Sequence, residues 1–537
     1  MGIIAKQSIQ GTIVTYLGVA VGFVTTFFVL TRFLSAEEIG LARVLVDAAT
    51  LFIGLAQLGT SSSIIRFYPH FKHSVESCRM VQNSLELSSA EKTTLNNSTQ
   101  PLNNATQPSD HGFFFWTLIV PLVGFALFTA IYCACHEPLS HWFGEKSPLF
   151  VEYYYMVLPM AFFMLYQTVF ETNANVRMHI VVPRAVRELI TRIGLLVAYL
   201  LYAFRVVDIN GFVVALCSVY AVAMFCNMGY LFSLGEISLR PDWNFLRNNR
   251  SLVRQYLLYT GFLLISAVAS VLAPTLSSFF ITAEMGLSYT GIFAIATYIA
   301  VMVSIPYRSM AAIAAPQLAT AIKENNQHET AHLIQQVSST LLLIGGIILC
   351  VIWLNIDLIF HILPNGETYA SARQVVLMLA TSQLFIAVCT FTSSALNYSR
   401  FYAFSLLFSF ILTILSILLN NLLIPHFGMN GAAVSNLIAY AIYFLFITLT
   451  VRYTLHAPTF TRQHLKILLL IVVILNLNFL WQKYMPIHNI WFSSIVRSLV
   501  LIGGGCAVAW FKNLSPEINQ QVRSLLSNFQ QRKQSNF

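Results

Sequence analysis

The chain has 537 residues, of which 57% are hydrophobic and only 9% are charged. Soluble globular proteins carry roughly 25% charged residues, so this composition excludes a large soluble enzyme. The 42 Phe and 23 Tyr exclude a disordered chain, and a mean hydropathy of +0.70 indicates that most of the chain lies in lipid. The net charge of +9 comes from Lys and Arg scattered between apolar runs. This pattern favours membrane-topology signals over a nucleic-acid-binding face.

Apolar runs of about the length that a transmembrane helix needs, roughly 20 residues, follow one another along the chain. Fourteen are found: Ile9–Phe33, Leu41–Phe67, Phe113–Cys135, Val151–Phe170, Val186–Phe204, Phe212–Leu234, Tyr256–Ile281, Tyr289–Ala315, Ser338–Ile356, Val375–Leu396, Tyr402–Leu423, Gly431–Val451, Leu465–Trp481 and Ile490–Trp510. We therefore predict an all-α polytopic membrane protein with about fourteen transmembrane helices.

The distribution of Lys and Arg indicates the orientation, because these residues are enriched in cytoplasmic loops. With a cytoplasmic N-terminus, 23 of them lie on the cytoplasmic side and six on the outer side. Both termini are therefore predicted to be cytoplasmic. The long loop 72–112 is predicted to be cytoplasmic and disordered, because its tandem heptads LNNSTQP and LNNATQP have no residues to form a core.

The sequence also contains a weak internal repeat. A shift of 251 residues aligns Gly40-Leu41-Ala42 with Gly291-Ile292-Phe293, at the start of the second and the eighth span. We expect two six-helix repeats that form an N-lobe (1–236) and a C-lobe (237–456), followed by two extra helices (457–511) and a cytoplasmic tail (512–537). Repeated halves of this kind are typical of transporters.

Charged residues within spans are costly and usually functional. Arg43 and Asp47 are four residues apart, so they share one face of the second span. One interpretation is a cation that is presented to an anionic head-group and held by the aspartate. The alternative is an internal ion pair that only fixes the packing.

A further set of charges lies near the predicted cytoplasmic ends of spans: Arg66, Glu171, Arg177, Arg192, Arg308 and Arg400. The forked guanidinium group suits a phosphate, but the positive-inside rule and snorkelling to lipid head-groups explain single members equally well. Arg308 is the strongest candidate, because it follows Pro306 within the eighth span. Arg373 opens the tenth span and Arg497 lies within the fourteenth, and each is either a cavity cation or a snorkelling side chain.

Pro274 and Pro306 interrupt spans and are candidate hinges, with a static kink as the alternative reading. No protease, hydrolase or nucleotide-binding motif occurs, and no metal or cofactor motif is found, so we predict that the chain is not an enzyme. A membrane-embedded glycosyl polymerase or ligase is disfavoured because the longest outer loops are only His136–Phe150 and Asp357–Ala372. Any energy input must come from a substrate gradient or from an ion, H⁺ or Na⁺.

Two stretches resemble the signatures of bacterial polysaccharide-unit flippases, which serve O-antigen, capsule and exopolysaccharide synthesis. The first, Leu30–Phe71, matches at Arg32, Phe33, Leu34, Glu37, Glu38, Gly40, Gly59 and Arg66. The second, Tyr289–Asn326, matches the second-half signature at Gly291, Pro306, Arg308 and Pro316. This family is part of the multidrug/oligosaccharidyl-lipid/polysaccharide exporter superfamily. The Asp-Ala-Phe and Arg-Arg-x-Phe-x-Glu-Gly signatures of the sister lipid II flippases are missing.

The resemblance implies a flippase that moves undecaprenyl-pyrophosphate-linked oligosaccharides across a bacterial inner membrane, by alternating access around a cationic cavity. Its expected partners are the lipid-linked oligosaccharide, membrane lipids, a polysaccharide polymerase and glycosyltransferases, with no nucleic acid. The candidate cavity residues are Arg43, Asp47, Arg66, Arg308, Arg373 and Arg400. The alternative is an ion-coupled exporter of small amphiphilic or cationic compounds, although exporters of this superfamily usually have twelve spans.

Overall fold

The computed structural model describes residues 3–68, 112–235, 250–457, 459–484 and 489–512, with single residues at 237, 239, 241, 243, 514 and 519. Within these ranges it leaves out the side chains of 3–10, 12, 252–253, 257–270, 308–309 and 312–313. The heptad repeat, nearly all of the predicted loop 72–112 and most of the predicted tail lie outside the described residues.

The described part of the chain is almost entirely helical and contains no strand, which confirms the predicted all-α class. The first half comprises α1 (Ile3–Val24), the π-helical η1 (Thr25–Leu30), α2 (Thr31–Phe33), α3 (Ala36–Ala56), a helical stretch over 60–68, α5 (Phe113–Ala134), α6 (His136–Gly144), α7 (Pro148–Glu152), the 3₁₀-helical η2 (Tyr154–Met156), α8 (Val157–Val176), α9 (Val181–Ala185), the π-helical η3 (Val186–Ile190), α10 (Thr191–Ala203) and α11 (Ile209–Ser233).

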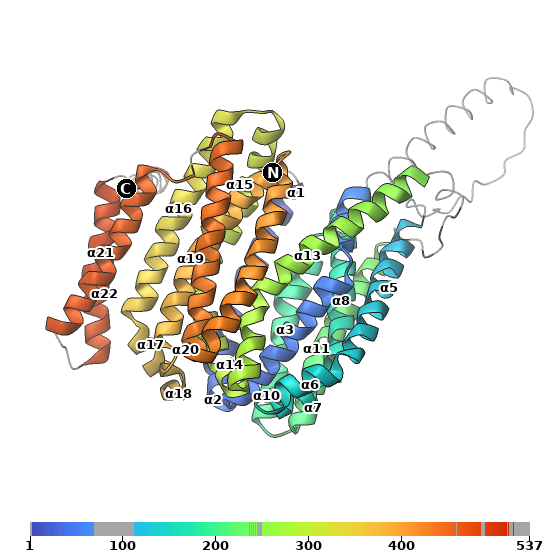
Figure 1. The fold of residues 1–537 in the computed structure, drawn as a ribbon, viewed down its shortest axis with the longest axis horizontal. Coiled ribbons are helices and arrows are strands. Elements are labelled where there is room, and N and C mark those ends of the chain that lie inside the picture. Colours follow the sequence, from blue (N-terminus) through green and yellow to red (C-terminus); the bar gives the residue numbers. More distant parts are fainter. Residues whose placement is uncertain are drawn as a thin grey trace, which may run out of the picture. The chain divides into compact units, whose positions relative to one another are not determined.

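The second half also consists of helices, which are coloured from green through yellow to red in Figure 1. It comprises α13 (Arg250–Met285), α14 (Leu287–Val301), the 3₁₀-helical η4 (Met302–Ser304), α15 (Ile305–Lys323), α16 (Gln327–Leu354), α17 (Ile356–Ile362), α18 (Gly366–Ala370), α19 (Arg373–Tyr398), α20 (Tyr402–Thr454), α21 (Arg462–Tyr484) and α22 (Ile490–Phe511). Each of the fourteen predicted spans falls on one or more of these helices.

Ten of the described helices are long and apolar enough to cross a membrane. One of them, α20, contains two predicted spans joined across a kink at Gly428, whose φ of 57° and ψ of −135° are not helical. A positive φ is readily adopted only by glycine, so this residue permits the bend. The remaining predicted spans fall on α7 to α8, on η3 to α10 and on α13.

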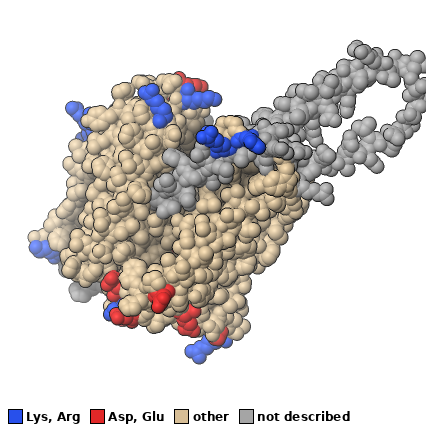
Figure 2. Space-filling model, turned by 45° about the vertical axis from the view of Figure 1, so that its right-hand side comes forward, with Lys and Arg blue, Asp and Glu red and all other residues tan. Residues whose placement is uncertain are grey.

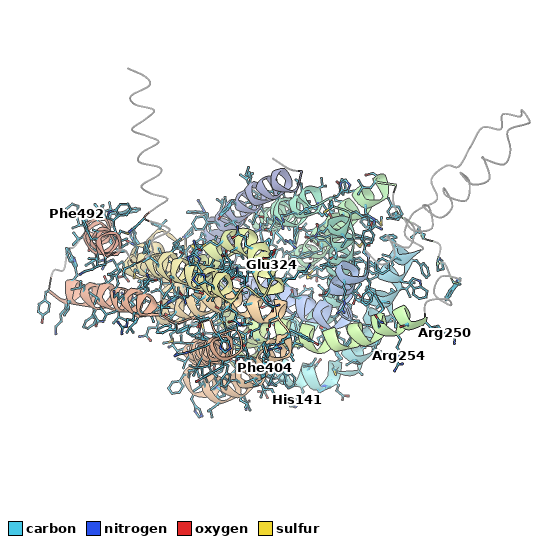
Figure 3. All side chains as sticks on the ribbon, turned by 90° about the horizontal axis from the view of Figure 1, so that it is seen from above. His141, Arg250, Arg254, Glu324, Phe404 and Phe492 are labelled. Carbon is cyan, nitrogen blue, oxygen red and sulfur yellow. The ribbon has the colours of Figure 1, made fainter. Side chains whose placement is uncertain are left out.

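Large apolar side chains cover the flanks of these helices. Phe404 on α20 is 42% exposed and Phe492 on α22 is 58% exposed, and both point outward in Figure 3. On the face drawn in Figure 2, Lys, Arg, Asp and Glu gather largely at the ends of the helices and leave the flank between them uncharged. An uncharged, aromatic-rich flank is what a lipid environment requires, so the chain is a multi-pass membrane protein.

The chain divides into two compact units. Unit 1 comprises Met1–Thr25 with Val44–Val271, and unit 2 comprises Thr26–Arg43 with Leu272–Phe537. Two of the three crossings between the units therefore lie within continuous helices, α3 and α13. The predicted lobe boundary at residues 236 and 237 stays a prediction.

The core of unit 1 lies where α5, α8 and α11 meet. Phe114 on α5, Phe170 on α8 and Leu231 on α11 are buried against one another. Tyr166 is also buried in this cluster and donates a hydrogen bond of 3.0 Å from its hydroxyl to the Leu118 carbonyl oxygen. Its polar end is therefore satisfied, as a buried tyrosine requires.

In unit 2, α19 packs against α14, α16 and α20. Small and polar residues allow these helices to approach closely, as is usual for helix contacts in membranes. Ser277 on α13 donates to the Asn420 side-chain oxygen at 3.2 Å and accepts from the Asn436 amide at 3.2 Å. These bonds connect α13 to both arms of α20.

The two glycines that the repeat aligns lie in direct contact, both within unit 2. A Cβ atom on Gly40 would overlap the Leu287 carbonyl oxygen, and a Cβ atom on Gly291 would overlap the Ala36 carbonyl oxygen. The contact is reciprocal, because Ala36 and Leu287 are themselves related by the shift of 251 residues. The starts of α3 and α14 therefore cross with the local two-fold symmetry that an internal repeat predicts.

The last two helices, α21 and α22, lie side by side against α16 (Figure 1). Near the middle of α16, the buried His464 side chain of α21 lies 3.4 Å from the Ser339 hydroxyl. At the C-terminal end of α16, Arg497 of α22 donates to the carbonyl oxygen of Leu354, the last residue of that helix. Asn355 and Ser498 exchange two hydrogen bonds there, of 2.9 and 3.1 Å. Arg497, which the sequence left as a cavity cation or a snorkelling side chain, therefore caps a helix.

We expect Arg497→Met to loosen α22 from α16, because it leaves the Leu354 carbonyl without its donor. A lost buried hydrogen bond of this kind costs about 1–3 kcal/mol. Cys350, which is buried beside α21 and α22, should then react faster with a maleimide dye. Arg452→Met, at an exposed position of α20, is the matched control. Equal labelling of Cys350 in the two variants would contradict this role for Arg497.

Candidate functional site

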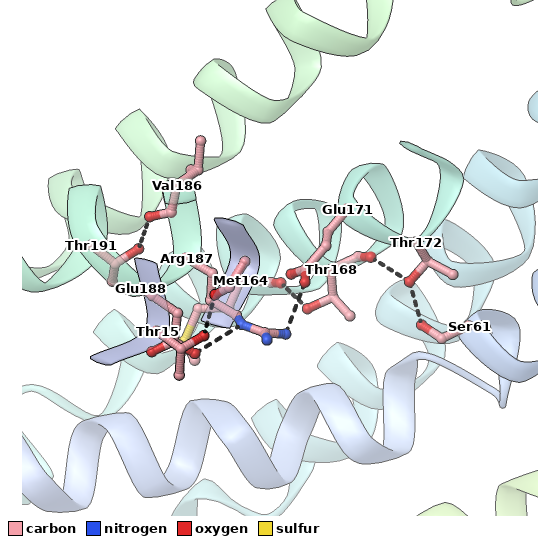
Figure 4. A network of polar contacts seen from close by, with 11 residues as sticks. Thr15, Ser61, Met164, Thr168, Glu171, Thr172, Val186, Arg187, Glu188 and Thr191 are labelled. Carbon is pink, nitrogen blue, oxygen red and sulfur yellow. Dashed lines mark hydrogen bonds and ion pairs between the residues drawn. The ribbon is translucent and has the colours of Figure 1, made fainter. Parts of the chain in front are cut away.

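Unit 1 contains a network of ion pairs that joins α8, η3 and α10 (Figure 4). Arg187 Nη1 lies 2.9 Å from Glu171 Oε1, and Arg187 Nε lies 3.6 Å from Glu188 Oε1. Arg192 Nη2 lies 3.0 Å from Glu188 Oε2. Arg187 is therefore shared between two carboxylates on different helices, and we call these four residues the charge network.

The π-helical segment η3 sets the register of the charge network. Arg187 and Glu188 lie on η3, and Arg192 follows it at the start of α10. A π-turn places residue i+5 one turn along the axis, where an α-helix would place residue i+4. The Thr191 hydroxyl accordingly donates to the Val186 carbonyl oxygen, five residues earlier, at 3.2 Å. The wide turn brings Arg187 toward α8 while Glu188 still faces Arg192.

A glycine face on α1 makes room for this segment. Arg192 Nη1 donates to the Gly18 carbonyl oxygen at 2.8 Å. A Cβ atom on Gly18 would overlap the backbone carbonyl of Glu188, and one on Gly22 would overlap the Arg192 guanidinium group. A Cβ atom on Gly11 would lie 2.9 Å from Arg184 Nη1. The three glycines therefore let α1 approach η3 closely enough for the helix backbone to bind the half-buried Arg192.

We expect Gly18→Ala to destabilise unit 1 by about 1–3 kcal/mol, because the added methyl group meets backbone atoms that have no room to move. Gly229→Ala, on α11, is the matched control, since nothing lies within 4 Å of a Cβ atom there. In an open helical position this change favours the folded state by about 0.5–1 kcal/mol. Thermal unfolding in detergent should move in opposite directions for the two variants.

Burial differs sharply within the charge network. The side chains of Glu171 and Glu188 are 9% and 10% exposed, whereas that of Arg187 is 51% exposed. Charge interactions are much stronger in a buried environment than in water. The accessible part of the network is therefore the Arg187 guanidinium group, whose two carboxylate partners are covered.

A second buried cation lies at the end of α8. Arg177 donates to the backbone and side-chain oxygens of Asn173 at 2.9 and 3.2 Å, and its guanidinium group lies 5.0 Å from the Tyr68 ring centroid. The Asn173 amide donates in turn to the Thr117 hydroxyl at 3.1 Å. With 7% of its surface exposed, Arg177 does not snorkel, contrary to that reading of the sequence.

The residues predicted to line a cavity are spread over the structure. Arg43 is half-buried, with its guanidinium group 5.7 Å from the Tyr298 ring centroid, and Asp47 is buried one turn further along α3. Arg66 and Arg400 are exposed, and each lies over the ring of the following phenylalanine. Their assignment to a cavity stays a prediction.

The other predicted residues are placed as follows. Arg373 lies in an ion pair of 3.0 Å with Asp357 and 5.6 Å from the Trp353 ring centroid. The side chain of Arg308 lies outside the described residues. Pro306 is in the first turn of α15, directly after the 3₁₀ segment η4, and Pro274 lies within α13. Their roles as hinges stay predictions.

Sequence reasoning named Glu171 and Arg192 as single candidates near span ends, but it did not connect them into a network. It counted Arg187 only among the cytoplasmic cations and did not consider Glu188. The available signal was a glutamate between two arginines directly before the apolar run of α10. Within the described ranges, no group of three His, Cys, Asp or Glu side chains could hold a metal ion.

No known family model matches this sequence, and no curated protein matches it closely. The fold does match solved structures. The lipid II flippase MurJ, in an inward closed conformation, aligns over 94% of this chain and 100% of its own, with a TM-score of 0.67 and 12% identity. An inward-facing multidrug resistance MATE transporter aligns over 82% of this chain and 95% of its own, with a TM-score of 0.59 and 15% identity.

A third match has a binding pocket of reversed polarity. This transporter of the same superfamily, from Pyrococcus furiosus, aligns over 86% of this chain and 96% of its own, with a TM-score of 0.52 and 14% identity. The chain therefore has the fold of the multidrug/oligosaccharidyl-lipid/polysaccharide exporter superfamily, of which flippases and exporters are both members.

Proposed function

We propose that this chain is a flippase of lipid-linked oligosaccharides. It moves undecaprenyl-pyrophosphate-linked sugar units from the cytoplasmic to the periplasmic leaflet of a bacterial inner membrane, by alternating access, for surface polysaccharide synthesis. The observation that carries this proposal is the extent of the fold match. It includes the whole of a lipid II flippase, and it covers more of this chain than the match to the multidrug transporter does.

The charge of the helices around the charge network supports an anionic substrate. The stretch from α8 to α10 carries four arginines and two glutamates, which leaves a positive excess: Arg177, Arg184, Arg187 and Arg192 against Glu171 and Glu188. Guanidinium groups match the geometry of a pyrophosphate better than ammonium groups do. A cationic drug would be repelled by the same excess.

The test is deletion of the gene, followed by isolation of polyprenyl-linked sugars and staining of surface polysaccharide. We expect lipid-linked repeat units to accumulate on the cytoplasmic side and the surface polymer to be lost. Unchanged polymer together with new sensitivity to cationic dyes would favour the second candidate, an ion-coupled exporter, which the fold match to a multidrug transporter also supports. Polymerase and glycosyltransferase partners follow only from the first result.

A further inference from the structure

Arg187 is shared between the two glutamates of the charge network. Its guanidinium group contacts one oxygen of Glu171 at 2.9 Å and one oxygen of Glu188 at 3.6 Å. These are single contacts to two different carboxylates, whereas the strongest arginine–carboxylate pairs are two-pronged. Because the Arg187 side chain is also half-exposed, a doubly charged anion with several oxygens competes favourably for it.

The two carboxylates would respond differently to the loss of Arg187. Glu188 keeps its 3.0 Å ion pair with Arg192, and the Gly18 carbonyl of α1 holds that arginine in place. Glu171 has no second ion pair within 4.0 Å among the described residues. Its other charged neighbours, Arg184 and Glu188, act on it at longer range and with opposite signs.

The remaining helices around Glu171 supply no further charge. The sequences of α5 and α11 contain no Asp, Glu, Lys or Arg, and neither does α1 from Gly11 onward. On α8 itself, Arg177 is bound to Asn173 and lies over Tyr68. A buried carboxylate that loses its counter-ion favours the protonated form.

We infer that the charge network is a site at which an anion and a proton bind together. A diphosphate group binds Arg187 and displaces Glu171, and Glu171 takes up one proton from water; release of the diphosphate restores the ion pair and returns the proton. This inference rests on the proposed function, because it takes the diphosphate from that substrate class. It assigns the coupling to protons and names the residue that carries them.

The test uses the full-length protein in nanodiscs, with farnesyl diphosphate as the probe. Titration calorimetry at about pH 8, where a phosphate group with a second pKa of about 6 is already deprotonated, is repeated in two buffers of different ionisation enthalpy. The wild type should take up about one proton for each diphosphate bound. Glu171→Gln should bind the probe about tenfold more tightly, because Arg187 loses a competing carboxylate, and should take up no proton.

Arg187→Gln should weaken binding at least tenfold, and Arg187→Lys should weaken it less, since it retains the charge without the fork. Glu145→Gln and Arg452→Gln, at exposed positions, are the matched controls and should leave both quantities unchanged. Proton uptake that persists in Glu171→Gln, or binding that is unchanged in Arg187→Gln, overturns this inference alone. A wild-type protein that binds no diphosphate overturns the proposed function as well.

Discussion

Gly40→Ala is expected to lower the stability of unit 2 by more than about 2 kcal/mol, because the new methyl group occupies the position of the Leu287 carbonyl oxygen. Gly291→Ala should have an effect of the same size, since it meets the Ala36 carbonyl oxygen in the symmetric position. Thermal unfolding can be followed through the thiols of Cys350 and Cys389, which are buried in unit 2 and react with a maleimide dye only when the unit opens.

The double variant distinguishes a shared contact from two separate ones. If the first methyl group already forces α3 and α14 apart, the second adds little, and the two effects sum to less than their independent values. Gly504→Ala is the matched control, because α22 leaves open space around that position. Unfolding temperatures for Gly40→Ala that equal those of Gly504→Ala would show that the helices do not cross at these glycines.

Arg43→Glu is expected to abolish surface polysaccharide while the protein still inserts into the membrane. Arg43 lies one turn after the glycine crossing, half-buried over the Tyr298 ring, and a carboxylate there would be repelled both by the ring face and by an anionic head-group. We expect the same result for Arg308→Glu, on the basis of the sequence. Polymer staining measures the loss of surface polysaccharide, and lipid-linked sugar analysis measures the accumulation of its precursors. Immunoblotting of membranes measures the inserted protein.

Arg32→Glu provides the control for this charge reversal. Arg32 lies close to Arg43 in the sequence but is exposed, over the ring of its neighbour Phe33, so its reversal should leave the polymer unchanged. Arg43→Lys should retain part of the activity, because the charge remains while the planar contact with Tyr298 is lost. Normal polymer in Arg43→Glu cells would leave Arg43 with a packing role only.

The helical framework follows directly from the sequence, because lipid imposes a simple rule. Each predicted apolar run falls on a helix, since backbone groups in lipid have no partner other than their own helix. Even the weak repeat had physical content: the two glycines that it aligns, Gly40 and Gly291, are the ones that touch. Close approach of two helix backbones requires a residue without a side chain, and the sequence has a glycine at both contact positions.

Only part of the charge network could be derived in the same way. Glu188 and Arg192 are four residues apart and pair on any regular helix, but 3.6 residues per turn place Arg187 on a different face from Arg192. The π-helical η3 changes this register. The segment fits because α1 has glycines, which carry no side chain, where it packs against η3 and the start of α10. The partner of Arg187 on the other side, Glu171, comes from a different helix, and no spacing in the sequence connects the two.

What the sequence by itself determined is the environment and the helical framework: an all-α membrane protein and the apolar runs that form its helices. Each of these depends on composition and on local or periodic patterns, which a single chain displays in full. The tertiary structure alone decided which cations are bound and by what. Arg497 caps α16, Arg373 pairs with Asp357, and Arg187 is shared between two buried glutamates. Arginines with similar sequence contexts have different roles, because the free energy of each guanidinium group depends on its contacts with other helices.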